Sequence, residues 1–181
     1  MVAGTAWPID LPTLQVREVA LDVAVLRLWR PTDASIATLS RAFALPWPTT
    51  PNTVAGGTPR VLWLAPAEWG IVGQPSGAVR ARVAQACPDA LWHLADLTEG
   101  RVGFVIGRER ARDLLAKGCS LDLHPRAFGG DACAQTLLEQ VNVWIERQGG
   151  ASAHDAFLVH ADRSVAAWLR DWFTDAALED T

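Results

Sequence analysis

One cysteine and histidine pair in this chain has the residue types for nucleophilic chemistry. Cys119 precedes His124 on a short segment that follows Gly118. A reactive cysteine needs a neighbouring base that favours the thiolate, and an imidazole is a common base for this purpose. Cys119, however, alternates with Leu121 and Leu123, as a small apolar residue does in a packed segment. We therefore expect the Cys119 side chain to lie in the core rather than to react.

Cys133 adds a third zinc-binding residue type to Cys119 and His124. Structural zinc sites use paired cysteines and a fourth ligand, and the spacing here supplies neither. His93 lies in a predicted strand, and the sequence places no carboxylate beside His154 or His160. We therefore predict no metal site and no general acid–base pair.

Two aspartates are expected to have structural roles in turns. Asp96 precedes the turn 98–100, and Asp122 lies in the segment after Gly118. Aspartate at such positions accepts hydrogen bonds from nearby backbone N–H groups. The glycine pairs 56–57 and 129–130 lack the strand-to-helix setting of a phosphate-binding loop. We therefore expect no catalytic residue and no cofactor-binding residue in this chain, so that any dinucleotide would bind elsewhere.

The composition argues against nucleic-acid-binding, secreted and membrane-spanning proteins. The chain has 181 residues and a formal net charge of −4, and its basic residues are scattered, which disfavours nucleic-acid binding. Three cysteines without paired spacing indicate reduced thiols. No secretory signal is recognisable, and the longest apolar stretch, 19–28, is too short to cross a membrane. We expect a soluble, cytoplasmic protein, and some of its nine tryptophans should reach the surface.

Hydrophobic periodicity predicts the secondary structure. Residues 1–12 form an N-terminal arm in which Trp7 is a candidate anchor. The predicted strands are 15–19, 23–29, 61–64, 70–72, 91–96, 101–106, 134–138, 141–146 and 156–160. The predicted helices are 32–43, a helix capped by Ser76 that ends before Cys87, 109–117, and a last helix with Val165, Trp168, Leu169 and Trp172 on its buried face. Adjacent strands should pair as hairpins, including 15–19 with 23–29 and 91–96 with 101–106.

The order of these elements is similar in two halves of the chain, about 13–90 and 91–181. Each half has strands followed by a helix, then more strands and a second helix. Such an order favours antiparallel sheets with helices packed on one face. We predict an α+β fold in which residues 13–181 form a single domain built from a duplicated module.

One segment of the sequence is distinctive enough to indicate a family. Residues 119–128 read Cys-Ser-Leu-Asp-Leu-His-Pro-Arg-Ala-Phe, after the helical sequence 110–115 and before Cys-Ala-Gln-Thr at 133–136. With the turn at 96–101 and the Leu-Ala-Pro-Ala-Glu-Trp sequence at 64–69, this pattern resembles the gamma subunit of heterotetrameric sarcosine oxidase. The closing helix 163–172 also fits, so that the resemblance extends over about two-thirds of the chain.

The resemblance implies a fold like the folate-binding domain of aminomethyltransferases and a role inside a larger enzyme. In that family the complex oxidatively demethylates sarcosine to glycine. Its FAD, FMN, NAD and tetrahydrofolate are carried by other subunits, and zinc is carried by the smallest one. The gamma subunit is not known for catalytic residues. The resemblance therefore implies a non-catalytic chain that docks on the alpha subunit and, through it, joins the beta and delta subunits.

An obligate subunit should show an apolar surface where the partner binds. The residues expected at that surface are Trp47, Trp69, Leu121, Leu123, His124, Pro125, Arg126 and Phe128. The alternative hypothesis is a stand-alone module that binds folate or another one-carbon carrier, which requires a concave pocket with a few polar groups. A self-sufficient aminomethyltransferase is disfavoured, because the chain is too short for the additional domains of those enzymes.

Overall fold

The computed structural model describes residues 7–148 and 156–178. Within this part, the chain divides into two compact units. Unit 1 combines Met1–Ala20 with Gly100–Thr181, and unit 2 is the intervening segment Leu21–Glu99. This division differs from the predicted halves, because the first strands of the chain belong to the same unit as its C-terminal part. His154 lies outside the described residues.

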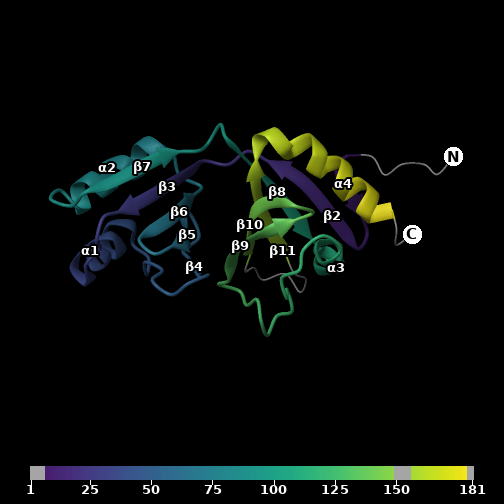
Figure 1. Cartoon of the computed structure of the whole chain (residues 1–181), viewed down its shortest axis with the longest axis horizontal. Coiled ribbons are helices and arrows are strands. Elements are labelled where there is room, and N and C mark those ends of the chain that lie inside the picture. The colour runs from purple at the N-terminus through teal and green to yellow at the C-terminus, as the bar shows by residue number, and fades with distance from the viewer. Residues whose placement is uncertain (1–6, 149–155, 179–181) are drawn as a thin grey trace. The chain divides into compact units, whose positions relative to one another are not determined.

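Unit 1 contains a six-stranded antiparallel sheet (Figure 1). Its strands are β1 (Ile9–Leu11), β2 (Leu14–Val19), β8 (Arg101–Gly107), β9 (Cys133–Leu138), β10 (Val141–Arg147) and β11 (Ala156–Asp162). Their order across the sheet is β1-β2-β8-β11-β10-β9. Glu139 and Gln140 connect β9 to β10 with φ values of 46° and 68°, as a two-residue hairpin turn requires. The predicted N-terminal arm therefore includes a strand of this sheet.

Two helices contribute to the core of unit 1, α3 (Ala111–Ala116) and α4 (Ala166–Leu178), the latter after the short 3-10 turn η1 (Arg163–Val165). The Phe173 ring of α4 lies 5.3 Å from the Phe104 ring of β8. The predicted buried face of the last helix was wrong for Trp168, which is 45% exposed. Leu169 faces inward as predicted, and Phe173 does so as well, together with alanines that let the helix pack closely.

The glycine at position 118, shortly after the end of α3, has a steric reason. Gly118 does not adopt the left-handed conformation that is common after a helix, since the glycines with positive φ in the described chain are Gly56 and Gly73. A Cβ atom at Gly118 would lie 2.6 Å from the Trp172 ring of α4. This position therefore needs glycine because α4 packs directly against it.

Unit 2 contains a five-stranded antiparallel sheet and two helices. The strands are β3 (Val23–Leu28), β4 (Val54–Ala55), β5 (Arg60–Ala65), β6 (Glu68–Val72) and β7 (Trp92–Asp96), in the order β4-β5-β6-β3-β7. The helices are α1 (Asp33–Phe43) and α2 (Ser76–Ala86). Leu39 and Phe43 of α1 and Val79 and Val83 of α2 share one apolar core with this sheet.

The ends of α1 follow from local chemistry. Thr32 and Ser35 form a capping box, in which each side chain accepts a hydrogen bond from the backbone N–H of the other. Ala44 ends the helix in the left-handed conformation, and its N–H bonds to the last turn. The prediction of a helix over 32–43 is confirmed. Ser76, in contrast, does not cap α2 with its side chain, which bonds to Asp96 instead.

The α+β class is confirmed, with both sheets antiparallel. The predicted hairpins 15–19 with 23–29 and 91–96 with 101–106 were wrong. Strand β2 pairs with β1 and β8, whereas β3 pairs with β6 and β7, which also leaves β7 and β8 in different sheets. The chain passes between units at both places, so that neighbours in sequence are not neighbours in a sheet. No helix among the described residues is long and apolar enough to cross a membrane.

Candidate functional site

The connection between α3 and β9 contains a short exposed segment with a buried residue on each side. Leu123 and Phe128 are 3% and 4% exposed and belong to the core of unit 1. Between them, His124, Pro125 and Arg126 are exposed. The leucine and phenylalanine therefore fix both ends of a loop that points its polar residues outward. We call residues 120–128 the signature loop.

Hydrogen bonds inside the signature loop define its shape. The Asp122 carboxylate accepts a bond from the His124 N–H at 2.9 Å, as predicted for this aspartate. The His124 carbonyl oxygen accepts from the Phe128 N–H at 2.8 Å. The Arg126 N–H donates to His124 Nδ1 at 3.2 Å. Because these bonds are local, the loop holds its conformation before it meets any partner.

Two arginines support the signature loop from neighbouring elements. Arg112 of α3 donates from Nε to the Leu123 carbonyl oxygen at 3.0 Å. Arg147 of β10 donates to the Phe128 carbonyl oxygen at 3.1 Å. These bonds satisfy carbonyl groups next to the two buried anchors. The loop is therefore tied to a helix and a strand of unit 1.

Cys119 packs in the core, as predicted. Its side chain is 6% exposed, and its Sγ atom lies 3.8 Å from Thr136 Oγ1. The His124 ring accepts the Arg126 N–H instead of contacting the thiol. Among the described residues, no group of three histidine, cysteine or acidic side chains is arranged to hold a metal ion.

Trp47 and Trp69, the expected interface residues in unit 2, lie inside that unit. They are 5% and 2% exposed, with their rings 5.7 Å apart. The Trp47 ring also contacts Phe43 at 5.2 Å, and Trp69 Nε1 donates to the Pro48 carbonyl oxygen at 2.7 Å. A partner would thus meet the exposed residues of the signature loop more readily than these two tryptophans. The interface itself stays a prediction.

The sequence analysis missed a buried pair between two strands of unit 1. His160 Nε2 of β11 lies 2.9 Å from Glu146 Oε1 of β10, and both side chains are 0% exposed. The expectation that His160 has no carboxylate beside it was therefore wrong. Trp144 lies directly opposite His160 in the sheet, with ring centroids 5.8 Å apart. The sequence contained one signal for a polar residue beside Trp144. Residues two apart in a strand share a face, so that Glu146 lies on the same face of β10 as Trp144.

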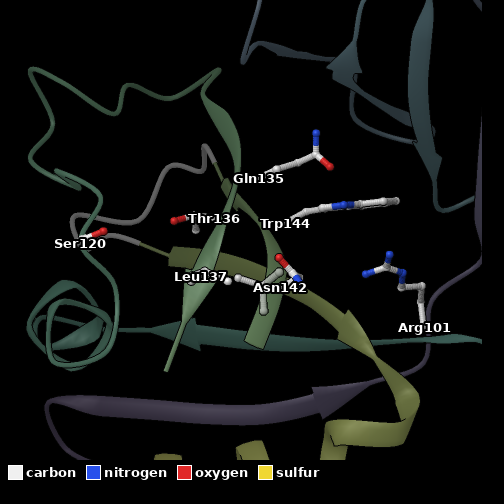
Figure 2. A pocket seen from close by; sticks show the side chains of 8 residues that line it. Arg101, Ser120, Gln135, Thr136, Leu137, Asn142 and Trp144 are labelled. Carbon is white, nitrogen blue, oxygen red and sulfur yellow. The ribbon is translucent and has the colours of Figure 1, made fainter. Parts of the chain in front are cut away.

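Arg101 lies over the same tryptophan. Its guanidinium is 4.4 Å from the Trp144 ring centroid, and its Nε atom is 3.7 Å from Asp162 Oδ1. Figure 2 shows Arg101 reaching toward the Trp144 ring, and Gln135 extending to the same side from the adjacent strand. The pair borders a pocket of about 510 Å³. The complete lining is Arg101, Ser120, Gln135, Thr136, Leu137, Asn142, Val143 and Trp144.

The chemistry available in this pocket is hydrogen bonding. Its lining contributes hydroxyl, amide, guanidinium and indole groups, none of which exchanges a proton near neutral pH. Glu146 and His160, the buried pair nearby, do not line it. Within the described residues, the pocket therefore has the groups to bind a polar molecule but not the groups for acid–base catalysis.

Asp96 is held as the sequence predicted, at a turn rather than in a reactive site. Its carboxylate accepts a bond from the Thr98 N–H at 3.0 Å and another from the Ser76 hydroxyl. These bonds, that of Ser76 foremost, lower the pKa of the Asp96 carboxyl below its usual range. The carboxylate stabilises the end of β7 in its ionised form.

The fold belongs to a known structural class. The chain is similar to the glycine cleavage system aminomethyltransferase T from Bartonella henselae, with a TM-score of 0.59 and 14% sequence identity. The match covers 89% of this chain and 45% of that one. At this identity the likeness shows the architecture alone. The two sheets and their helices are therefore an aminomethyltransferase-like fold.

Closer relatives show the family. The sequence model of the sarcosine oxidase gamma subunit family matches residues 30–179. Sarcosine oxidase subunit gamma from Corynebacterium sp. (strain P-1) is 30% identical over 170 residues, covering 92% of this chain and 83% of the relative. The corresponding protein from Arthrobacter sp. is 30% identical over 165 residues, covering 90% and 81%. The chain belongs to the sarcosine oxidase gamma subunit family.

A solved structure agrees with this membership. A chain of the heterotetrameric sarcosine oxidase from Corynebacterium sp. U-96, in complex with pyrrole 2-carboxylate, matches with a TM-score of 0.81 and 27% identity. The match covers 92% of this chain and 84% of that chain. The signature loop and its supporting arginines lie within the region that the family model matches.

Proposed function

We propose that this chain is a non-catalytic gamma subunit that docks on the alpha subunit of a heterotetrameric sarcosine oxidase. The proposal rests on one observation: over 92% of its length, this protein is similar to one chain of a solved heterotetrameric sarcosine oxidase. The proposed complex oxidatively demethylates sarcosine to glycine. Its FAD, FMN, NAD and tetrahydrofolate belong to the other subunits, and the beta and delta subunits join through alpha.

The geometry of the signature loop supports a docking role. His124, Pro125 and Arg126 are exposed on a loop that is already ordered by its own hydrogen bonds. A preorganised loop loses little conformational entropy when it binds, which favours affinity. Arg126 offers a planar guanidinium, a group common in binding hot spots. We propose that this loop contacts the alpha subunit.

The proposal assigns the complex to the cytoplasm. All three cysteines are buried and form no disulfide bond, an arrangement that suits a reducing compartment. Their thiols are enclosed by the chain's own packing, so that the subunit contributes shape and contact rather than a reactive sulfur.

Coexpression tests the proposed function. A tagged form of this chain is expressed with the alpha, beta and delta subunits and captured, and the captured material is assayed for sarcosine-dependent oxygen consumption. We expect all four chains to be recovered together with activity. The same capture without the alpha subunit is the control, and it should recover neither beta nor delta. Failure of the alpha subunit to associate with this chain would refute the proposal.

The stand-alone alternative has its own measurement. Titration calorimetry of the isolated chain with tetrahydrofolate should show no saturable heat if the chain is a structural subunit. Binding in the micromolar range by the isolated chain, combined with no capture of the alpha subunit, would favour the one-carbon carrier module instead.

A further inference from the structure

Unit 2 carries a groove that the signature loop does not explain. Its volume is about 500 Å³. It lies where β3 ends and β7 begins, beside the first turns of α1 and the end of α2. The lining residues are Leu28, Trp29, Arg30, Pro31, Thr32, Ala34, Ser35, Thr38, Ala86, Cys87, Pro88, Asp89, Ala90 and Leu91. We call this the Trp29 groove.

Two large apolar side chains are exposed next to one another in the Trp29 groove. Trp29 is 65% exposed and Leu91 is 71% exposed. The Trp29 N–H donates to the Leu91 carbonyl oxygen at 2.8 Å, which keeps the two residues side by side at the end of the sheet. A single exposed apolar residue is ordinary, but adjacent ones in a groove are typical of an interaction site.

The hydroxyl groups that line the groove are already used within α1. Ser35 Oγ donates to the Thr32 carbonyl oxygen at 2.8 Å, while Thr32 Oγ1 accepts from the Ser35 N–H at 3.2 Å. Thr38 Oγ1 donates to the Ala34 carbonyl oxygen at 2.8 Å. These bonds belong to the helix and its cap. The wall formed by α1 therefore offers an incoming molecule mainly apolar contact.

Arg30 supplies a charge at the edge of the groove. Its guanidinium carbon lies 5.8 Å from the Trp29 ring centroid, and the side chain is exposed. In the described part of the chain, no carboxylate forms an ion pair with Arg30. Its φ of 50° is uncommon for a residue with a side chain. Such conformations cluster at binding sites, where the backbone aims a side chain.

The charges around the groove define what would complement it. Arg30 and the indole N–H of Trp29 are both hydrogen-bond donors, and within the described residues neither side chain has an acceptor. Asp89, also in the lining, would repel a second carboxylate, so that an acidic group is favoured at the Arg30 side. The complement is an apolar side chain that fills the groove, with a carboxylate next to it in sequence.

We propose that the Trp29 groove is a second docking site, occupied by a segment of the alpha subunit that inserts an apolar side chain beside Trp29 and pairs a carboxylate with Arg30. The inference rests on the proposed function, since it takes the partner from the heterotetrameric assembly of the relatives. Tryptophan and arginine are the residue types enriched at the energetic centre of interfaces. The two exposed side chains would then be covered in the complex.

Affinity measurements on the reconstituted complex test this proposal. The wild-type chain, Trp29→Ala and Arg30→Glu are each titrated onto an assembly of the alpha, beta and delta subunits. We expect Trp29→Ala to weaken binding by about 100-fold and Arg30→Glu by about tenfold or more, as for hot-spot residues. High salt should reduce the effect of Arg30→Glu and leave that of Trp29→Ala nearly unchanged.

Matched controls separate effects on folding from effects on docking. Trp168→Ala removes another exposed tryptophan, on α4, and Arg17→Glu reverses another exposed arginine, on β2. All four variants should keep the far-ultraviolet spectrum and melting temperature of the wild-type chain, while the two controls should bind like it. Groove variants that bind like the controls would overturn the docking site and leave the proposed function intact.

Two further outcomes would also overturn the groove proposal. If the wild-type chain does not bind the assembly at all, the proposed function is wrong, and the groove proposal, which depends on it, is wrong as well. If the isolated chain is a dimer in sedimentation equilibrium and Trp29→Ala makes it a monomer without weakening its binding to the other subunits, the groove joins two copies of this chain instead.

Discussion

A comparison of two arginine–tryptophan stacks, Arg101 over Trp144 in unit 1 and Arg30 over Trp29 in unit 2, shows how burial changes the role of the same residue pair. In unit 1, Arg101 lies over Trp144, which is 7% exposed, and approaches Asp162 as well. In unit 2, Arg30 lies over Trp29, which is 65% exposed. The first stack has its partners within the chain. The second has an exposed ring and, among the described residues, a guanidinium without an acidic partner, as the proposed docking site requires.

The surroundings explain why the two stacks differ. Trp144 is in the middle of β10, opposite His160, where both neighbouring strands fix its position. Trp29 directly follows the last residue of β3, so that it lies just beyond the end of the strand. A residue inside a sheet is surrounded by its own chain, whereas a residue at the end of a strand can face outward.

The largest expected effect comes from removing each tryptophan in turn. Trp144→Ala should lower the free energy of unfolding by about 3 to 5 kcal/mol, because it leaves a cavity beside the sheet. Trp29→Ala should change it by less than about 0.5 kcal/mol, as for an exposed residue. Urea unfolding followed by circular dichroism measures both. Equal losses for the two variants would show that the stacks do not differ as described.

A smaller effect is expected at the buried pair beside the first stack. Glu146→Gln should cost about 2 kcal/mol, because the buried His160 exchanges its carboxyl hydrogen-bond partner for an amide whose NH₂ group also needs a partner. The control is Glu68→Gln, which breaks the more exposed ion pair with Arg27 and should cost less than about 1 kcal/mol. Thermal unfolding of both variants at one pH gives the comparison. A cost for Glu68→Gln as large as that for Glu146→Gln would contradict it.

The smallest effect concerns Asp96, whose pKa is lowered by its hydrogen bonds to Ser76 and Thr98. Since the pKa in the folded state lies below that of the unfolded chain, the stabilisation is fully present above the unfolded pKa and is lost as pH falls through the folded pKa. Ser76→Ala should raise the pKa of Asp96 toward its usual value. Carbon-13 NMR titration of the carboxyl group measures the change, and an unchanged pKa would exclude Ser76 as its main cause.

Local structure was more predictable from the sequence than pairing between strands. The capping residue Thr32 and the prolines around α1 act within a few residues, so that the helix 32–43 was predicted closely. The pairing of β2 with β8 instead joins segments far apart in the chain, and period-two alternation carries no information about the partner strand. Assigning each strand to its neighbour in sequence therefore failed where the chain crosses between units.

The candidate sites show the same limit. The turn chemistry of Asp96 and Asp122 and the packing of Cys119 were predicted because each depends on adjacent residues. The hydrogen-bonded pair of Glu146 and His160 requires the register of two strands, which the sequence did not supply. Trp47 and Trp69 were expected at an interface from their residue type, yet they bury each other in unit 2. Residue type alone did not distinguish them from Trp29.

The central claim is that the signature loop and the Trp29 groove contact other subunits. Hydrogen exchange measured by mass spectrometry tests it most directly, on the isolated chain and on its complex with the alpha, beta and delta subunits. We predict slower exchange in the complex for peptides that contain the signature loop and for peptides that contain Trp29 and Arg30. Peptides from β8 and β10, which carry Arg101 and Trp144, should exchange alike in both samples. A stable complex in which neither exposed segment gains protection would contradict this account.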